Sequence, residues 1–395
     1  MHELSQMIKD DMKPALGVTE PGAIAFAVAK ARSFTKGDIK KVNVAMNSGM
    51  YKNAFTCGIP NSNEVGNVFA AALGVVAGNA DKGLESLADV TPEDNVKAQE
   101  MIDQGKITVE LSGITSRIFI EATVETEEDK AIVTIRDSHT NITKIIVNDK
   151  VELETEDEKK TEEDGGEEES HSIHKYTLQQ LYDYVTTVDI EEIRFINEAY
   201  KVNLELFHEG LENPRTTFAR QLLAINKGKE VSDDEQKTAS LMCNAAIEAR
   251  VIGLDKPAMS ITGSGAHGII ATMPLYAAYK VNGYTEEQLL RATALSYLVC
   301  MYIKEYSGRL SAFCGCAIAA GSGMACALVY LRGGTVEMMA HTLNNMASSI
   351  TGMICDGGNQ GCTMKGVAAV DAAYKSVEFA MNGIYISEVH GINGN

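Results

Sequence analysis

The residues of this sequence best suited to chemistry are four cysteines near its C-terminal end. Cys355 and Cys362 lie seven positions apart in a stretch rich in glycine and asparagine, and Cys314 and Cys316 precede them by about forty residues on an apolar segment. Thiolates are soft ligands that bind iron, whereas carboxylates prefer harder metals. The pattern therefore favours an iron–sulfur cluster. If only three thiolates reach the cluster, one iron keeps an open position and can act as a Lewis acid.

Structural zinc is the alternative interpretation of the same four cysteines. Zinc sites typically contain paired C-x₂₋₄-C or H-x₃₋₅-H units. Here the two pairs are separated by one and by six intervening residues, and no paired histidines lie nearby, so the cluster is favoured. On a helix, side chains at positions i and i+2 point roughly 200° apart. If this segment is helical, one of Cys314 and Cys316 is a ligand and the other a packing residue, and the sequence does not say which.

The remaining cysteines are expected to be packing residues, because free cysteine behaves as a small hydrophobic side chain. They are Cys57, Cys243, Cys300 and Cys326. The first residues, Met1–Ser5, have neither the basic nor the apolar region of a signal peptide, which predicts a cytoplasmic protein with reduced thiols.

The charge of the chain is negative and concentrated. The 395 residues carry a formal net charge of −19, and residues 151–170 hold eleven acidic residues against two lysines. Such a composition is unsuited to nucleic acid or an anionic membrane, so neither is expected as a partner. The acidic segment cannot bury a core and is expected to form a mobile loop near 152–170; binding of a basic partner is the alternative.

One uncharged stretch has the length of a membrane span. Twenty-two residues without charge lie between Arg309 and Arg332, but glycine, alanine, serine and cysteine dominate them. A helix buried on all sides of a large protein gives the same pattern. A buried helix is therefore expected here.

The first part of the chain mixes helix and strand signals. Residues 3–34 have helical periodicity with a helix start at Thr19–Pro21, and residues 41–46 alternate as a strand. An apolar helix is expected over 66–76 and another helix after Thr91. Four further segments alternate apolar and polar residues, which predicts an antiparallel sheet with one solvated face: 107–111, 118–126, 131–136 and 143–148.

Beyond Tyr176 the pattern is helical. Capping boxes at 232–235 and 285–288 each predict a helix start, and long apolar-periodic segments continue to about residue 382. The fold class is therefore α+β. We expect an α+β domain over residues 1–172, with a small antiparallel sheet, and an all-helical domain over 173–395 that carries the cluster cysteines.

Two polar loops could bind a small ligand. Gly263–Gly268 formally matches G-x-G-x-x-G, but a dinucleotide site needs a preceding strand and a suitably placed acid, and Lys256–Met259 make a poor strand. The loop opens an apolar helix, so its amides could still hold a carboxylate; close packing of the helix is the alternative. Ser48–Asn53 forms a second polar turn with a cation, Lys52, and Arg309 could clamp a carboxylate.

Together these segments resemble the iron–sulfur L-serine dehydratase α-chain superfamily, and especially its single-chain branch that includes L-cysteine desulfidases. The matching segments follow the family's order and span nearly the whole chain. They are Leu16–Gly17 with Thr19–Pro21, Ser48–Asn53, Asn61–Ser62, Thr262–Gly268, Gly308–Cys316 and Ile354–Gly357.

The resemblance implies an oxygen-sensitive [4Fe–4S] cluster held by three cysteines, without pyridoxal phosphate. It also implies an elimination that yields pyruvate and ammonia from a β-substituted amino acid. The ligands would be Cys355, Cys362 and one of Cys314 or Cys316. The resemblance also implies residues that position the substrate: Ser48, Lys52, Asn53, Gly263, Ser264, Gly265 and Arg309. Lys52 is in addition a candidate catalytic residue.

The sequence departs from the cysteine desulfidases at one chemically important position. In that branch a cysteine between the glycine and the threonine of the Gly-x-Thr-Glu-Pro motif is the proposed proton acceptor, whereas this chain has Val18. The glycine loop commonly carries Gln where this chain has His267. Imidazole is the commonest general base near neutral pH, so His267 is our candidate for the base. A histidine that only hydrogen-bonds the substrate is the alternative.

We therefore expect a [4Fe–4S]-dependent lyase that releases pyruvate, ammonia and sulfide from L-cysteine. The alternatives are an L-serine or L-threonine dehydratase on the same scaffold, and a non-catalytic iron–sulfur sensor. The expected partners are a small amino-acid substrate and, given the chain size and apolar helical content, further copies of the chain in a homo-oligomer.

Overall fold

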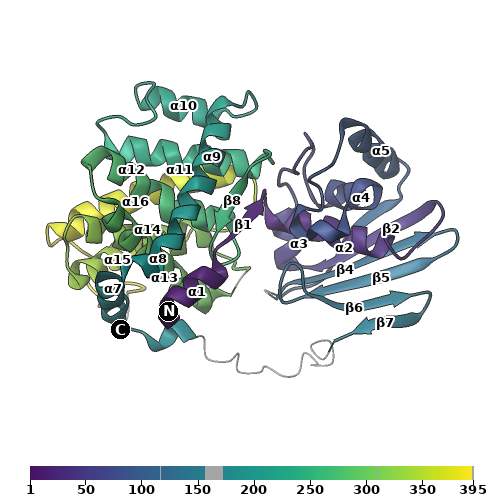
Figure 1. The fold of residues 1–395 in the computed structure, drawn as a ribbon, viewed down its shortest axis with the longest axis horizontal. Coiled ribbons are helices and arrows are strands. Elements are labelled where there is room, and N and C mark those ends of the chain that lie inside the picture. The colour runs from purple at the N-terminus through teal and green to yellow at the C-terminus, as the bar shows by residue number, and fades with distance from the viewer. Residues whose placement is uncertain (116, 156–171, 309, 394–395) are drawn as a thin grey trace.

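The computed structural model describes residues 1–115, 117–155, 172–308 and 310–393. Helices and a sheet gather in two parts (Figure 1): the sheet with its helices comes mainly from the first third of the chain, and the helical part comes mainly from the rest. The α+β fold class is confirmed. The segment expected to be an acidic loop lies mostly outside the described residues, although its start forms the last strand of the sheet, β7.

The sheet has six strands in the order β3-β2-β4-β5-β6-β7. Its strands are β2 (Ile39–Asn47), β3 (Ile107–Gly113), β4 (Phe119–Thr126), β5 (Lys130–Arg136), β6 (Ile142–Val147) and β7 (Lys150–Glu154). The expectation of a purely antiparallel sheet was wrong in one respect, since β2 lies between β3 and β4 and pairs with β3 in parallel. The connection from β2 to β3 contains several helices and is long enough for the crossover that a parallel pair requires.

Two apolar helices, α2 (Thr19–Arg32) and α4 (Asn67–Ala77), pack against each other beside this sheet (Figure 1). Along β4, Ile120, Ala122 and Val124 are buried while their neighbours are partly exposed, the alternation expected of a sheet with one solvated face. The remaining α-helices of this part are α3 (Ser48–Ala54) and α5 (Pro92–Asp103); α5 starts after Thr91 as expected, and Thr91 forms a capping box there.

The N-terminal segment is not one continuous helical region, as the periodicity suggested. Helix α1 (Glu3–Asp11) ends before Pro14, and residues Lys13–Leu16 form strand β1, which pairs with β8 (Pro257–Ser260). Proline lacks an N–H and disfavours helical geometry in the residue before it, which explains the break. Because β1 pairs with β8, residues 13–16 lie with the helical part, and a domain division at residue 172 stays a prediction.

The helical part is built around helices that are buried along most of their length. Its elements are α7 (Leu178–Thr187), α8 (Ile190–Ile193), α9 (Asn197–Glu212), α10 (Phe218–Ile225), α11 (Glu235–Val251), α12 (Gly265–Asn282), α13 (Glu286–Ser307), a π-helical turn (Cys316–Ala320), α14 (Gly321–Leu331), α15 (Val336–Ile350) and α16 (Gly361–Met381). The uncharged stretch forms the π-helical turn and α14, both largely buried, as expected. None of the helices in the described ranges is long and apolar enough to cross a membrane.

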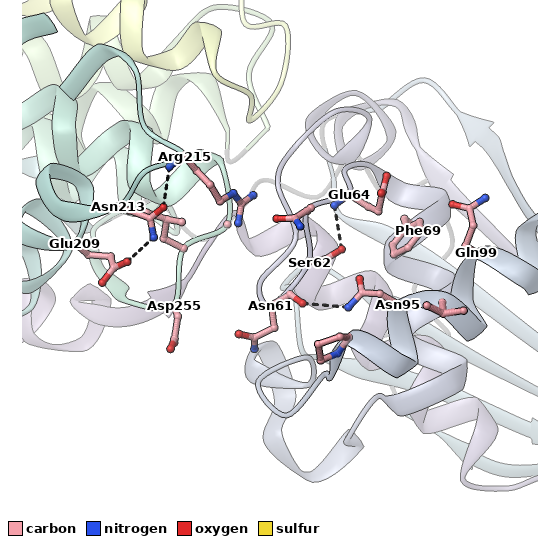
Figure 2. A pocket seen from close by; sticks show the side chains of 15 residues that line it. Asn61, Ser62, Glu64, Phe69, Asn95, Gln99, Glu209, Asn213, Arg215 and Asp255 are labelled. Atoms are coloured by element: carbon pink, nitrogen blue, oxygen red, sulfur yellow. Dashed lines mark hydrogen bonds between the residues drawn. The ribbon is translucent and has the colours of Figure 1, made fainter. Parts of the chain in front are cut away.

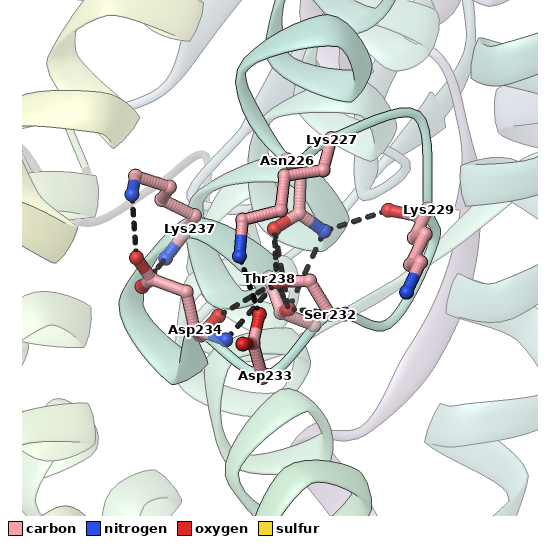
Figure 3. Close-up of polar contacts among 8 residues, drawn as sticks. All are labelled: Asn226, Lys227, Lys229, Ser232, Asp233, Asp234, Lys237 and Thr238. Atoms are coloured by element: carbon pink, nitrogen blue, oxygen red, sulfur yellow. Dashed lines mark hydrogen bonds and ion pairs between the residues drawn. The ribbon is translucent and has the colours of Figure 1, made fainter.

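The starts of α11 and α13 test the two predicted capping boxes. Thr285 caps α13 with the expected reciprocal bonds to Gln288. For α11 the predicted cap residue was wrong: Asp234, not Ser232, accepts the bond from the backbone N–H of Lys237 (Figure 3). The hydroxyl of Ser232 instead joins a buried polar cluster in the preceding turn, so the helix begins two residues later.

Candidate active site

One cavity lies where the start of α2, the glycine loop before α12 and the two cysteine segments meet. Its wall comes from both parts of the molecule, since Glu20, Asn53 and His139 belong to the sheet part, whereas the glycine loop and the cysteine segments belong to the helical part. All four candidate cluster ligands line it: Cys314, Cys316, Cys355 and Cys362. Segments about forty residues apart in sequence therefore contribute thiols to one site.

Backbone pairing brings the two cysteine segments together. The N–H of Cys314 donates to the carbonyl of Met353 at 2.8 Å, and the N–H of Cys355 donates to Ala312 at 2.9 Å. Cys362 lies in the first turn of α16. Cys314 and Cys316 would face apart on a helix, but the helical turn begins only at Cys316. Both side chains consequently line the cavity.

The arrangement of these thiols fits a cluster. The described residues include no group of three His, Cys, Asp or Glu side chains placed to hold one metal ion, so the fit rests on the chemistry of the thiols alone. In a [4Fe–4S] cluster each thiolate binds its own iron. Thiols spaced around one cavity are therefore a suitable ligand set for a cluster.

Two lysines flank the thiols. The charge of Lys304, which is buried, acts on one cysteine of each segment, and the charge of Lys365 acts on the other two. The thiol of Cys316 hydrogen-bonds Cys314, and this bond is the main cause that lowers the pKa of Cys314. Cationic side chains favour the thiolate form that binds iron.

His267 is buried in the first turn of α12 and lines the same cavity. The hydroxyl of Thr262 donates to the carbonyl of Ile261 at 2.7 Å, so its oxygen accepts the hydrogen bond from Nδ1–H of His267. Burial, followed by the positive charges of two nearby side chains, lowers the pKa of His267 well below its usual value. The imidazole is therefore neutral at pH 7, and Nε2 is the nitrogen that can accept a proton.

The glycine loop is shaped by two tight backbone requirements. Gly263 has φ +73°, and a Cβ on Gly268 would lie 1.8 Å from the carbonyl oxygen of Met259, which only glycine avoids. The expectation that the residues before the loop make a poor strand was wrong, because Pro257–Ser260 form β8 with β1 as partner. That pairing is antiparallel, whereas a dinucleotide-binding unit is built on parallel strands.

Glu20 is a buried carboxylate in the same cavity. It accepts hydrogen bonds from Asn53 Nδ2 at 2.8 Å and from the hydroxyl of Thr19 at 3.2 Å. His139 Nε2 lies 3.8 Å from Glu20 Oε1. Burial raises the pKa of Glu20, but His139, Asn53 and the charge of Arg250 outweigh it and lower the pKa to about 2.

This shift predicts an acid dependence of stability. A carboxyl whose pKa is lower in the folded state stabilises the fold above its unfolded-state value and loses that contribution as pH falls. For Glu20 the loss should occur between about pH 4.5 and pH 2 and amount to about 3 kcal/mol. Urea unfolding of wild type and Glu20→Gln across this range should show a steeper decline in the wild type. Equal slopes would contradict the assignment; the exposed Glu100→Gln on α5 serves as the control.

The structure brings several sequence candidates to the cavity and leaves others outside it. Asn53, Gly263, Ser264 and His267 line it with the four cysteines, and Gly265 begins the helix beside them. Arg309 lies outside the described residues.

Two candidates on α3 point elsewhere. The hydroxyl of Ser48 exchanges hydrogen bonds with the backbone of Thr115, in the loop after β3. Lys52 Nζ donates to the carbonyl of Ser311 at 3.3 Å, so it ties α3 to the first cysteine segment without lining the cavity.

Five charged or titratable side chains of the site were not predicted as functional: Glu20, His139, Arg250, Lys304 and Lys365. Glu20 had a signal, since it belongs to the Thr19–Pro21 segment of the resemblance. Arg250 had a weaker one, as a cation within the apolar helix α11. His139 had none, because its turn between β5 and β6 reaches the site only through folding.

A second and larger cavity, of about 520 Å³, opens between the two parts (Figure 2). Arg215 and Asn213 face it from the helical part, and Ser62 and Asn95 face it from the sheet part. Several of its polar groups bond within one side, for example Asn213 Nδ2 to Glu209 at 2.9 Å. None of the candidate catalytic or metal-binding residues lines this cavity.

The site is thus a cavity between an α+β part and a helical part, and its wall carries four thiols and a neutral histidine. Residues 81–394 match the family model described as serine dehydratase alpha chain. The chain is 40% identical to a UPF0597 protein of Clostridium botulinum, over 98% of this chain and 90% of that protein. Corresponding proteins of Caldanaerobacter subterraneus and Bacteroides fragilis are 36% and 34% identical over 99% of this chain and 91% and 90% of theirs.

The chain belongs to the serine dehydratase alpha chain family. The superfamily resemblance is thereby confirmed. The family is named after serine dehydratase, which relates the chain to a lyase family of amino-acid catabolism.

Proposed function

We propose that this protein is a [4Fe–4S]-dependent lyase that catalyses α,β-elimination on a small β-substituted L-amino acid, with L-cysteine as the first candidate substrate. The observation that carries the proposal is the joint lining of one cavity by four thiols and by His267. Thiols supply cluster ligands, and a neutral imidazole supplies a base. The single-chain architecture resembles the cysteine desulfidase branch, which places L-cysteine first.

The cluster would be held by Cys355, Cys362 and one of Cys314 and Cys316. When bound, it would supply an iron with an open position that acts as a Lewis acid. Lys304 adds positive charge to a site that must accommodate several thiolates, and Lys365, which is paired with Asp356, also acts on two of them.

The chain's own residues would manage the proton. Nε2 of His267 takes the α-proton, the Cα–Cβ double bond forms, and the Cβ–S bond breaks with its electron pair leaving on sulfur. The proton held at Nε2 is then available to the departing sulfide. The released aminoacrylate takes up water and yields pyruvate and ammonia without further help. The hydrogen bond from Nδ1 to Thr262 keeps the imidazole in the tautomer that this step needs.

L-serine is the second candidate, and position 18 favours it. Val18 lines the cavity beside the second cysteine segment, and a Cβ on Gly358 would lie 2.7 Å from Val18 Cγ1. The proton-accepting cysteine of the desulfidases would therefore stand inside this site, and valine cannot replace it. The family description points to serine as well.

Product analysis separates these functions. The protein, purified anaerobically with its cluster, should release pyruvate, ammonia and sulfide in equal amounts from L-cysteine. If L-serine is the substrate, pyruvate and ammonia should form from it with the higher kcat/KM. A cluster-loaded protein that forms pyruvate from neither amino acid would contradict the enzymatic proposal and favour the iron–sulfur sensor.

A further inference from the structure

Two buried side chains of opposite charge line the cavity without pairing with each other. Arg250 and Glu20 are 4% and 6% exposed. The near neighbour of Glu20 is His139, whose Nε2 lies 3.8 Å from Oε1, and Arg250 acts on Glu20 only as a more distant charge. The Nε–H of Arg250 has no hydrogen-bond partner among the described residues. A buried charge without hydrogen-bond partners is costly, so this pair is suited to a ligand that satisfies both members.

The surrounding backbone holds the guanidinium of Arg250 beside the start of α12. Arg250 lies on α11, and a Cβ on Gly265 would come within 2.6 Å of its Nε. Glycine at the first position of α12 thus leaves room for the arginine to pass. Glu248, two residues earlier on α11, accepts hydrogen bonds from the backbone N–H groups of Thr217 and Ala219 at 2.8 Å, and this capping fixes the helix that presents Arg250.

The carboxylate of Glu20, in the same cavity, is held by two hydrogen bonds. Asn53 and Thr19 each donate to one of its carboxylate oxygens. A carboxylate oxygen can accept more than one hydrogen bond, so both oxygens keep capacity for a further donor. An ammonium group offers three donors.

We propose that Arg250 binds the α-carboxylate and Glu20 the α-ammonium of the amino-acid substrate. The inference rests on the proposed function, because it assigns these groups to an amino acid in that site. It gives Arg250 the carboxylate-binding role that the sequence suggested for Arg309. A guanidinium can bind a carboxylate through two parallel hydrogen bonds, which fixes orientation as well as affinity.

Three ligands that share a thiol test the assignment by calorimetric titration of the full chain. They are L-cysteine, cysteamine, which lacks the carboxylate, and 3-mercaptopropionate, which lacks the ammonium. Wild type should bind L-cysteine about 10- to 100-fold more tightly than either analogue, the range expected for a charge-assisted hydrogen bond. Because the thiol is common to all three, the differences report the two charged groups alone.

The variants should remove these preferences one at a time. In Arg250→Met, L-cysteine should bind only as tightly as cysteamine, whose own affinity should stay within about threefold of wild type. In Glu20→Gln, L-cysteine should match 3-mercaptopropionate. Arg250→Lys keeps the charge without the planar fork and should fall between wild type and Arg250→Met, and it replaces that variant if Arg250→Met does not fold. Arg215→Met, in the second cavity, is the matched control and should keep the full preference.

The outcomes test the binding roles of Arg250 and Glu20 separately from the proposed elimination reaction. An unchanged preference in a folded Arg250→Met or Arg250→Lys variant, or equal binding of all three ligands by wild type, would overturn the assignment even if pyruvate is formed. If the variants lose the preference but the wild type forms no pyruvate, the binding roles of Arg250 and Glu20 are supported and the proposed reaction is overturned.

Discussion

Replacing Cys355 by serine is expected to remove the iron–sulfur cluster and to lower pyruvate formation by about 10³-fold or more. Serine is a poorer ligand for iron than thiolate, and the Lewis acid contributes several kcal/mol to transition-state stabilisation. Cys362→Ser should behave in the same way, because both thiols line the cavity from the second cysteine segment. Iron and sulfide analysis beside the pyruvate assay measures both effects.

The first cysteine segment sharpens this prediction. If three thiolates hold the cluster, only one of Cys314→Ser and Cys316→Ser should lose iron to the same extent as Cys355→Ser. Cys326→Ser, a replacement of a fully buried thiol that does not line the cavity, is the control and should retain its iron. Full iron and sulfide content in both Cys355→Ser and Cys362→Ser would show that the cysteine assignment is wrong.

Replacing His267 by glutamine should lower kcat by about 10²- to 10⁴-fold, the usual contribution of a general base, while iron content stays at the wild-type level. Glutamine can still hydrogen-bond Thr262 and the substrate, but it cannot accept the α-proton. The expected signature is therefore a loss in kcat with a smaller change in KM. Exchange of the α-proton of the substrate with deuterated solvent, measured by NMR, should fall in parallel.

A His267→Gln variant with full turnover would remove histidine from the base role and leave it a substrate contact. A Thr262→Val variant provides a graded control, because it removes the hydroxyl that accepts the bond from Nδ1–H. It should lower kcat less than His267→Gln does, since the base remains and only its tautomer and orientation are less well defined. An equal loss in both variants would point to damage to the loop.

Residues that line the cavity were foreseen from the sequence where a local signal marked them. The four cysteines, His267 and Asn53 were candidates from residue type and motif, and the structure brings them to one cavity. Arg250 and His139 were missed because their functional environment is made by tertiary contacts between α11, the β5–β6 turn and the loops. Ser48 lies outside the cavity lining, since the side chain that follows β2 hydrogen-bonds the loop after β3.

In the fold, too, elements with a local sequence signal were predicted and elements defined by tertiary pairing were not. Long elements such as α4, α12 and the strands β4 to β6 follow clear periodicity and were predicted from it. The four-residue strands β1 and β8 are too short to show alternation, and only their mutual pairing defines them. The parallel pairing of β2 with β3 depends on a crossover that no local pattern records.

The central claim is that the four-cysteine cavity holds a cluster that an amino acid reaches. The most direct test is to purify the full chain without oxygen, determine its iron and sulfide, and record its visible absorption while L-cysteine and then L-serine are added. We predict a broad visible band with about four irons per chain, perturbed by one of the two amino acids. A colourless protein that contains zinc, or no metal after reconstitution with iron and sulfide, would contradict the account.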